Sequence, residues 1–206
     1  MSNKMDDKIK DGTDEDLEFV LLCRSGDVDA FEVLVERHQK RMLNIAYRMT
    51  DNYDDACDVV QEAFLSAFKS IKKFRGEARF STWLTGILIN HAKNRLKQMK
   101  TRSMHEGISI DGPVETESGS YNMEPQSPEM PVVEQLVQKE VQVQVQKCVN
   151  SLDETSREVV ILRDMQGFSY EEISHILKLP EGTVKSRLFR ARDALRNCLK
   201  KVLGDI

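Results

Sequence analysis

The side chains best suited to contact nucleic acid lie close to the C-terminus, where basic and apolar residues alternate. The stretch reads E-G-T-V-K-S-R-L-F-R-A-R-D-A-L from Glu181 to Leu195. At about 100° per residue, Val184, Leu188 and Leu195 share one apolar face of a helix. Phe189 falls on the opposite, charged face. An exposed aromatic residue is ordinary by itself, so its meaning depends on the neighbouring segment.

That neighbouring segment predicts a helix-turn-helix. Ser169 and Glu172 form a capping box in F-S-Y-E-E-I-S-H-I-L-K-L-P, and Pro180 ends the short helix. A short helix, a tight turn and a longer basic helix make the motif whose second helix enters the DNA major groove. We therefore expect base contacts from Lys185, Ser186, Phe189 and Arg190, and phosphate contacts from Arg187, Arg192 and Arg196.

A second candidate surface lies in the segment from Ser70 to Lys97, where basic residues are interleaved with aromatic ones. Such a surface suits single-stranded nucleic acid, because cations follow the backbone while aromatic faces stack on unpaired bases. The loop and the start of the next helix contribute Phe74, Arg75, Gly76, Arg79, Phe80 and Trp83, and the polar stripe of that helix contributes Gly86, Asn90, Lys93, Lys97 and Lys100. Two alternatives stay open: Phe80 and Trp83 can anchor the loop to a core, and Asn90 can be an ordinary solvent-facing residue.

Residues for catalysis or metal binding do not gather in the sequence. The histidines are scattered, and no nucleophile is paired with a base at a recognisable spacing. The cysteines lie far apart and form no CxxC or Cys/His pattern. The sequence therefore predicts no catalytic residue, no cofactor and no metal, and it favours buried free thiols over a disulfide. The residues concerned are His38, His91, His105, His175, Cys23, Cys57, Cys148 and Cys198.

The net charge of −4 conceals an uneven distribution. Residues 69–102 hold 10 basic and 1 acidic residues, and residues 181–206 hold 7 and 3. Between them, residues 103–135 hold 7 acidic residues and no basic one. Two positively charged segments separated by an acidic one indicate two candidate nucleic-acid surfaces.

Periodicity predicts an all-α fold of two small helical domains joined by a flexible acidic linker. We expect a tail at 1–13, a domain at 14–102, the linker at 103–131 and a second domain at 132–206. The predicted helices cover about 14–24, 28–49, 53–73, 82–100, 132–150 and 154–165, followed by the helix-turn-helix. Asp27 is the expected cap of the second helix, and Ser81 or Thr82 that of the fourth. Because the polar N-terminus is no signal peptide and no apolar run could span a bilayer, we expect a cytoplasmic protein without membrane insertion.

Taken in order, these motifs resemble a bacterial RNA polymerase sigma factor of the extracytoplasmic-function (ECF) group, similar to the sigma-E type. D-A-F-E-V-L-V-E-R-H at 29–38 looks like the start of region two, and D-V-V-Q-E-A-F-L-S-A-F at 58–68 like its polymerase-binding helix. F-R-G-E-A-R-F-S-T-W-L at 74–84 resembles the melting segment, and the helix through I-N-H-A-K-N resembles the minus-ten reader. The helix-turn-helix resembles region four.

The resemblance implies a role for each surface. Polymerase binding falls on Asp58, Gln61, Glu62 and Leu65. Promoter melting and minus-ten recognition fall on Phe74, Arg75, Gly76, Glu77, Ala78, Arg79, Phe80, Trp83, Asn90, Lys93, Asn94 and Lys97. Minus-thirty-five recognition falls on Thr183, Lys185, Ser186, Arg187, Phe189 and Arg190. The implied partners are core RNA polymerase (clamp helices of the largest subunit, flap of the second-largest), promoter DNA and an anti-sigma factor.

Two other functions remain as alternatives. A stand-alone helix-turn-helix regulator carries a similar C-terminal motif, but it usually pairs that motif with an α/β receiver or a dimerisation domain. The N-terminal half here shows no βα alternation. An enzyme such as a resolvase needs a nucleophile, yet no acid/base set accompanies Ser66, Ser70 or Ser81.

Overall fold

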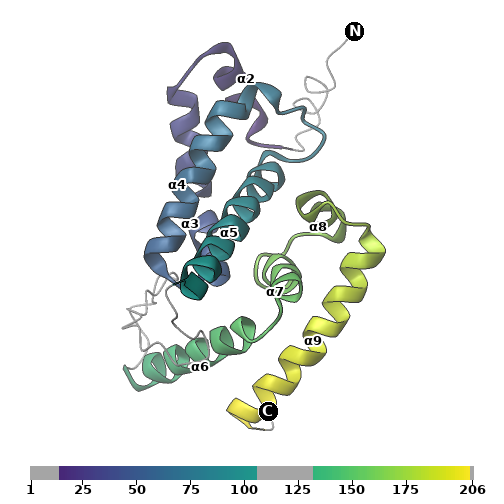
Figure 1. Ribbon diagram of the computed structural model, residues 1–206. Coiled ribbons are helices and arrows are strands. Elements are labelled where there is room, and N and C mark those ends of the chain that lie inside the picture. Colours follow the sequence, from purple (N-terminus) through teal and green to yellow (C-terminus); the bar gives the residue numbers. More distant parts are fainter. Residues whose placement is uncertain (1–13, 106–131, 205–206) are drawn as a thin grey trace. The chain divides into compact units, whose positions relative to one another are not determined.

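A computed structural model describes residues 14–105 and 132–204, and these residues form helices and turns without any strand (Figure 1). They belong to two compact units, one built around α2 to α5 and the other around α6, α7 and α9. The all-α prediction is therefore confirmed. The predicted tail at 1–13 and the linker from 106 to 131 lie outside the described residues.

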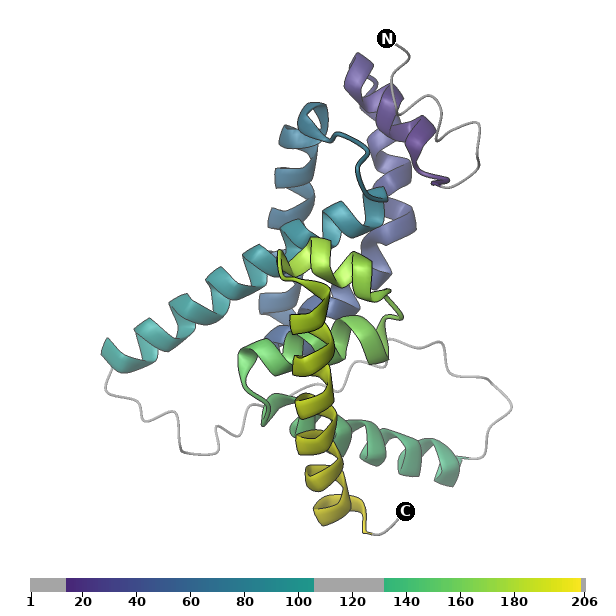
Figure 2. The same cartoon turned by 90° about the vertical axis from the view of Figure 1, so that its right-hand side faces the viewer.

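Within residues 14–105, the first unit has four α-helices and one 3₁₀ turn. Their bounds are α2 Leu17–Ser25, α3 Asp29–Thr50, α4 Tyr53–Ser70, η1 Ile71–Lys73 and α5 Phe80–His105. α3, α4 and α5 pack against one another, as both views of the ribbon show (Figures 1 and 2). Their shared core is formed by fully buried side chains that include Leu34, Met42, Ile45, Met49, Leu84, Leu88 and Ile89.

Short polar side chains set the helix ends of this unit. Asp27 accepts hydrogen bonds from the backbone of Asp29 and Ala30 at 3.0 and 3.2 Å, which confirms the predicted cap of α3. Asp51 takes a left-handed conformation (φ 56°) at the end of α3, and Asn52 then caps α4. The cap predicted for α5 is wrong, since α5 begins at Phe80, before Ser81 and Thr82. α5 also ends at His105, so the first residues of the predicted linker are helical.

In the second unit, two helices support the long second helix of the helix-turn-helix. The bounds are α6 Val132–Asn150, α7 Glu154–Val160, a π-helical turn η2 Ile161–Met165, α8 Tyr170–Leu177 and α9 Glu181–Leu203. α7 and α6 both pack on α9. The predicted capping box is confirmed, because Ser169 N–H donates to Glu172 at 2.8 Å and Glu172 N–H donates to Ser169 at 3.1 Å.

Two hydrogen bonds close the turn that separates α8 from α9. Leu179 N–H donates to the Ser174 carbonyl at 3.1 Å, and the Ser174 hydroxyl donates to the Leu179 carbonyl at 2.6 Å. Pro180 follows at the N-cap of α9 with its backbone extended (φ −59°, ψ 142°). A proline there ends one helix and starts the next, because its fixed φ suits the first turn and its missing N–H is not needed.

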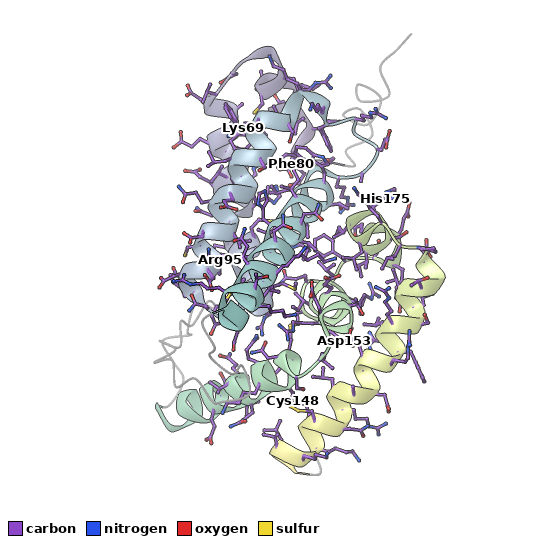
Figure 3. The ribbon with its side chains drawn as sticks, in the orientation of Figure 1. Lys69, Phe80, Arg95, Cys148, Asp153 and His175 are labelled. Atoms are coloured by element: carbon purple, nitrogen blue, oxygen red, sulfur yellow. A yellow bond between two sulfur atoms is a disulfide. The ribbon has the colours of Figure 1, made fainter. Side chains whose placement is uncertain are left out.

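The prediction that all four cysteines are free thiols is wrong for two of them. Cys148 and Cys198 form a disulfide with Cα atoms 5.7 Å apart, drawn in yellow beside Cys148 in Figure 3. Cys23 is a buried free thiol and Cys57 a half-buried one. The sequence could not show the pairing, because the two cysteines are 50 positions apart and are brought together only when α6 packs on α9.

Candidate nucleic-acid interface

The N-terminal half of α9 presents the predicted recognition residues to solvent. Phe189 is 77% exposed, and Lys185, Ser186 and Arg190 are also exposed, whereas Thr183 and Arg187 are half-buried. The opposite face is anchored by three buried side chains: Val184, Leu188 and Ala191. A bulky ring in water, on a helix that is otherwise correctly amphipathic, is available for contact with a partner.

Internal contacts hold two of the cations predicted to reach DNA. The Nε of Arg192 donates to Asp164 at 3.0 Å, and this bond raises the pKa of Arg192. Arg192 therefore fastens α9 to η2, and the phosphate contact expected of it stays a prediction. Lys185 lies 3.3 Å from Glu181 and 5.4 Å from the centre of the Tyr170 ring. Its ammonium group is oriented by these neighbours while its side chain stays exposed.

A groove of about 600 Å³ runs beside the recognition face, between α9 and the segment that connects α6 to α7. Arg187 and Arg190 line one wall. The other wall carries hydroxyl groups beside the carboxylate of Asp153, and the hydroxyls of Ser151 and Thr155 already donate to the Cys148 carbonyl and to Asp153. The lining residues on that side are Ser151, Asp153, Thr155 and Ser156. Sequence reasoning missed this wall, because serines and threonines near a helix start are expected to be caps alone.

The aromatic residues of the predicted melting segment form an internal cluster. Phe80 is fully buried and Phe74 is 3% exposed. Their ring centres lie 6.0 Å apart, and Trp83 lies 5.1 Å from Phe74 and 5.7 Å from Phe80. Of the alternatives left open, the structure favours the anchor for Phe80, whose position at the start of α5 is labelled in Figure 3. Trp83 is half-buried at the edge of the cluster.

The polar residues of this segment lie outside the aromatic cluster. Arg75, Glu77 and Arg79 are exposed, and Arg75 lies 3.8 Å from Glu77 across Gly76. Gly76 has φ 67°, a conformation that strongly favours glycine and lets the loop turn tightly. Ala78 is half-buried. Along α5, Asn90, Asn94 and Lys97 are exposed and Lys93 is half-buried, so the predicted polar stripe faces solvent.

Asp14 is a positioning residue that the sequence did not reveal. Its carboxylate accepts a hydrogen bond from the backbone N–H of Phe80 at 2.8 Å, and so caps α5 from 66 residues away. Two residues on, the carboxylate of Asp16 contacts His38 at 2.7 Å and accepts a bond from Arg37 at 3.2 Å. Burial by itself raises the pKa of Asp16, but the hydrogen bonds and charges of His38 and Arg37 lower it overall. The N-terminal segment therefore fixes the start of α5.

The residues that the resemblance assigns to polymerase binding share one face of α4. Asp58, Gln61, Glu62 and Leu65 are all exposed. Phe68, 40% exposed, follows Leu65 by three residues on the same face, and helical spacing could have added it to the prediction. An apolar pair within a polar rim is typical of a protein interface.

Two polar links tie this face of α4 to α5. The Nε of Arg95 donates to Asp55 at 2.7 Å, a hydrogen bond that raises the pKa of Arg95, and an Nη lies 3.6 Å from Asp58. His91 lies 3.1 Å from Glu62 through Nδ1 and 2.9 Å from the Ser66 hydroxyl through Nε2. Figure 3 labels Arg95 where it leaves α5. The helix expected to bind polymerase is thus joined to the helix expected to read DNA.

In the residues that the structure describes, no cluster of three or more His, Cys, Asp or Glu side chains is placed to hold a metal ion. None of the described helices combines the length and the apolar character needed to cross a membrane.

Comparison with known families gives two matches. A profile for Sigma-70 region 2 matches residues 34–102, and one for Sigma-70, region 4 matches residues 142–195. The first match contains the α4 face and the polar stripe of α5. The second contains the groove and the recognition face of α9.

Individual relatives span nearly the whole chain. An RNA polymerase sigma-H factor of Pseudomonas aeruginosa is 33% identical over 192 residues, which cover 93% of this chain and 97% of that protein. An ECF RNA polymerase sigma-E factor of Escherichia coli is 36% identical over 180 residues, covering 87% and 92%.

Two solved structures share the fold of this chain. The sigma factor RpoE of Bartonella quintana, solved with the anti-sigma factor NepR, is 26% identical with a TM-score of 0.62 and covers 84% of this chain and 98% of its own. CnrH, solved with the cytosolic domain of CnrY, shares the fold at a TM-score of 0.63 and 23% identity, covering 89% and 96%. The two profiles, the relatives and the fold agree that this chain belongs to the ECF group of RNA polymerase sigma factors.

Proposed function

We propose that this sigma factor reads the minus-ten element as separated strands, through α5 and the loop before it, and the minus-thirty-five element as duplex through α9. As a sigma factor, the chain directs RNA polymerase to promoters and is not a stand-alone regulator. The observation that carries the proposal is the presence of two exposed polar surfaces of different kinds. One is a convex helix face, and the other is a loop supported by aromatic rings.

Duplex reading by α9 is supported by the shape and chemistry of its exposed face. An α-helix fits the major groove of B-DNA, where each base pair presents its own donor and acceptor pattern. Arg190 can donate two bonds to a guanine edge, and the Phe189 ring can contact a thymine methyl group. Arg187, on the wall of the adjoining groove, is suited to contact the phosphate backbone. Thr183, Lys185 and Ser186 complete the contact face.

Single-strand reading is assigned to the exposed polar residues around the aromatic cluster. Phe74 and Phe80 serve as the buried support of the loop, and Trp83 offers the edge of its ring. A captured base is then contacted by Arg75, Gly76, Glu77, Ala78 and Arg79 from the loop and by Asn90, Lys93, Asn94 and Lys97 from α5. Exposed amides can bond the Watson–Crick edge of an unpaired base, and the lysines can follow its backbone.

Polymerase binding is assigned to the α4 face, with Asp58, Gln61, Glu62 and Leu65 against the clamp helices of the largest subunit. The second unit then contacts the flap of the second-largest subunit. Since a related sigma factor was solved with an anti-sigma factor, we also propose an anti-sigma partner for this chain. The assigned domains are 14–102 and 132–206, joined by residues 103–131.

Energetics require polymerase for promoter opening. Separating DNA strands costs about 1.4 kcal/mol per base-pair step. A base stacked on an aromatic surface returns about 1–3 kcal/mol. One captured base therefore does not offset a bubble of several base pairs, and polymerase contacts must supply the rest. We assign no catalytic step to this chain and place it in the cytoplasm with the polymerase.

Run-off transcription with purified core polymerase tests the proposal. Templates would be fragments of genomic DNA from the organism that encodes the chain, and the 5′ ends of all transcripts would be mapped. Starts that appear only with this protein and share two upstream elements support the proposal. Transcription that is unchanged by adding the protein contradicts it.

A further inference from the structure

A covalent link joins the two helices that frame the second unit. Cys148 lies on α6 and is fully buried, and Cys198 lies on α9 and is half-buried. The hydroxyl of Ser151 lies 4.0 Å from Sγ of Cys198. The other two cysteines, Cys23 and Cys57, belong to the first unit. The disulfide is not explained by promoter recognition.

The position of the link matters because the distal half of α9 contains no buried side chain. Val184, Leu188 and Ala191 are the buried residues of this helix, and they all belong to its first half. From Arg192 to Leu203 every side chain is exposed or half-buried. On α6, by contrast, Cys148 and Val149 are fully buried. The disulfide therefore fastens the weakly packed part of α9 to the well-packed end of α6.

We propose that Cys148 and Cys198 are a reversible thiol–disulfide modification site, closed by a low-molecular-weight disulfide and opened by a dithiol. In closing, the thiolate of the more accessible Cys198 attacks the small disulfide, forms a mixed disulfide and releases one thiol. The thiolate of Cys148 then attacks the sulfur of Cys198 and releases the second thiol. The two cysteines are oxidised, the small disulfide is reduced, and the two cysteine protons end on the released thiols.

Such a site responds to the redox state of its compartment. Disulfides are rare in the cytoplasm, and those that form there are usually transient or redox-sensing. Closing a loop of this length restricts the unfolded chain and stabilises the folded unit. This link to function rests on the function proposed above. The disulfide form, which forms under oxidising conditions, keeps the second unit folded and α9 available for the minus-thirty-five element. The dithiol form unfolds more readily.

The test of the site uses the full chain, incubated with oxidised glutathione or with dithiothreitol. Peptide mapping without reduction should find a Cys148–Cys198 link after oxidation, and dithiothreitol should remove it. Hydrogen exchange at residues 192–203 should be at least about threefold faster in the reduced form, with α3 unchanged. The second unit should melt at least about 5 °C lower when reduced. Two results would overturn the proposal: four thiols that can still be alkylated after oxidation, or hydrogen exchange at residues 192–203 that is equally fast in the oxidised and reduced protein.

Matched variants separate this pair from the remaining thiols. Cys198→Ser should abolish the difference between oxidised and reduced protein and behave as the reduced form does. Cys57→Ser, which changes a half-buried thiol of the first unit, should leave the difference intact. A redox response that survives Cys198→Ser, or disappears with Cys57→Ser, overturns the assignment.

A transcription arm links the site to the proposed function. Holoenzyme would be assembled from each redox form and from Cys198→Ser, and assayed on one promoter between 25 and about 45 °C. The oxidised wild type should remain active to a higher temperature than the other two. Equal thermal profiles would refute the link to transcription. Activity absent in every form would count against the proposed function, while the mapping and exchange results would still decide the modification site.

Discussion

At the scale of single residues, Phe189 carries the clearest functional signal of the molecule. Its ring is 77% exposed on a helix whose other face packs correctly, so packing gives no reason for an aromatic residue there. The interpretation as a base contact predicts that its loss weakens binding without loss of stability.

Phe189→Ala should therefore reduce minus-thirty-five-dependent transcription by about 1–2 kcal/mol, roughly 5- to 30-fold, because each lost base contact costs about that much. The melting temperature should change little, since the side chain buries almost nothing. Run-off transcription and thermal unfolding measure the two quantities. Asn197→Ala, exposed about two turns further along α9, is the control and should leave both unchanged. A large loss of stability in Phe189→Ala would show that the ring packs within the protein.

Asp14 gives a second prediction at this scale, because its carboxylate accepts the hydrogen bond from Phe80 N–H at the start of α5. Asp14→Ala should destabilise the first unit by about 0.5–2 kcal/mol, and Asp14→Asn should retain most of the stability because an amide oxygen also caps a helix. Urea unfolding followed by the fluorescence of Trp83, the one tryptophan of the sequence, measures both. If alanine and asparagine behave alike, Asp14 does not act through this hydrogen bond.

At the scale of elements, Asp153 shows how one carboxylate starts a helix. Hydrogen bonds from Ser156 and Thr155 lower the pKa of Asp153 to about 2 from 3.8. The folded state therefore favours the charged form. The charged carboxylate of Asp153 makes its full contribution to stability above the ordinary aspartate pKa of 3.8, and this contribution declines as the pH falls toward 2.

Asp153→Ala should cost about 0.5–2 kcal/mol at pH 7. The difference in stability between wild type and Asp153→Ala should become smaller as the pH is lowered from 5 to 3. Asp153→Asn is the matched control, since it keeps a capping oxygen but cannot titrate. Thermal unfolding across this pH range measures the effect. A stability difference between wild type and Asp153→Ala that does not change with pH would contradict the role of the charge.

The tie between α4 and α5 yields a prediction about how elements cooperate. Asp55 is 8% exposed, and Arg95 supplies its charged partner. Arg95→Ala should destabilise the first unit by roughly 1–3 kcal/mol, because a buried carboxylate loses its donor. Lys97→Ala, exposed on the same helix, should be neutral. Chemical denaturation of both variants provides the comparison, and equal midpoints would mean that the ion pair adds nothing.

At the scale of the whole molecule, the helical pattern of the sequence was sufficient for the fold class, the helix-turn-helix and most helix limits. Those features depend on periodicity and on caps a few residues away, such as Ser169 with Glu172. Contacts between distant segments were missed for a common reason. Asp14 with Phe80, Arg95 with Asp55 and Cys148 with Cys198 lie 66, 40 and 50 residues apart, and nothing local marks them.

The candidate site shows the same division. Exposure agrees with the prediction for Phe189, Arg190 and Asn90, which stood out as polar or off-face positions. Phe74 and Phe80 are buried, and for Phe80 burial matches the anchoring alternative that the sequence left open. Sequence alone cannot tell an aromatic residue that stacks on a base from one that supports the loop beneath. The ion pair of Arg192 was not predicted, since its partner Asp164 precedes it by 28 residues.

The central claim is that one chain reads separated strands with α5 and duplex with α9. Two footprints of a mapped promoter test it most directly, with holoenzyme carrying wild type, Asn90→Ala or Arg190→Ala: permanganate for unpaired thymines, and DNase I for protection of the duplex minus-thirty-five element. With wild type, thymines of the minus-ten region should become reactive. Asn90→Ala should keep protection of the minus-thirty-five element but lose the thymine reactivity of the minus-ten region. Arg190→Ala should lose protection of the minus-thirty-five element. Loss of the upstream protection in Asn90→Ala, or full opening in both variants, would contradict the account.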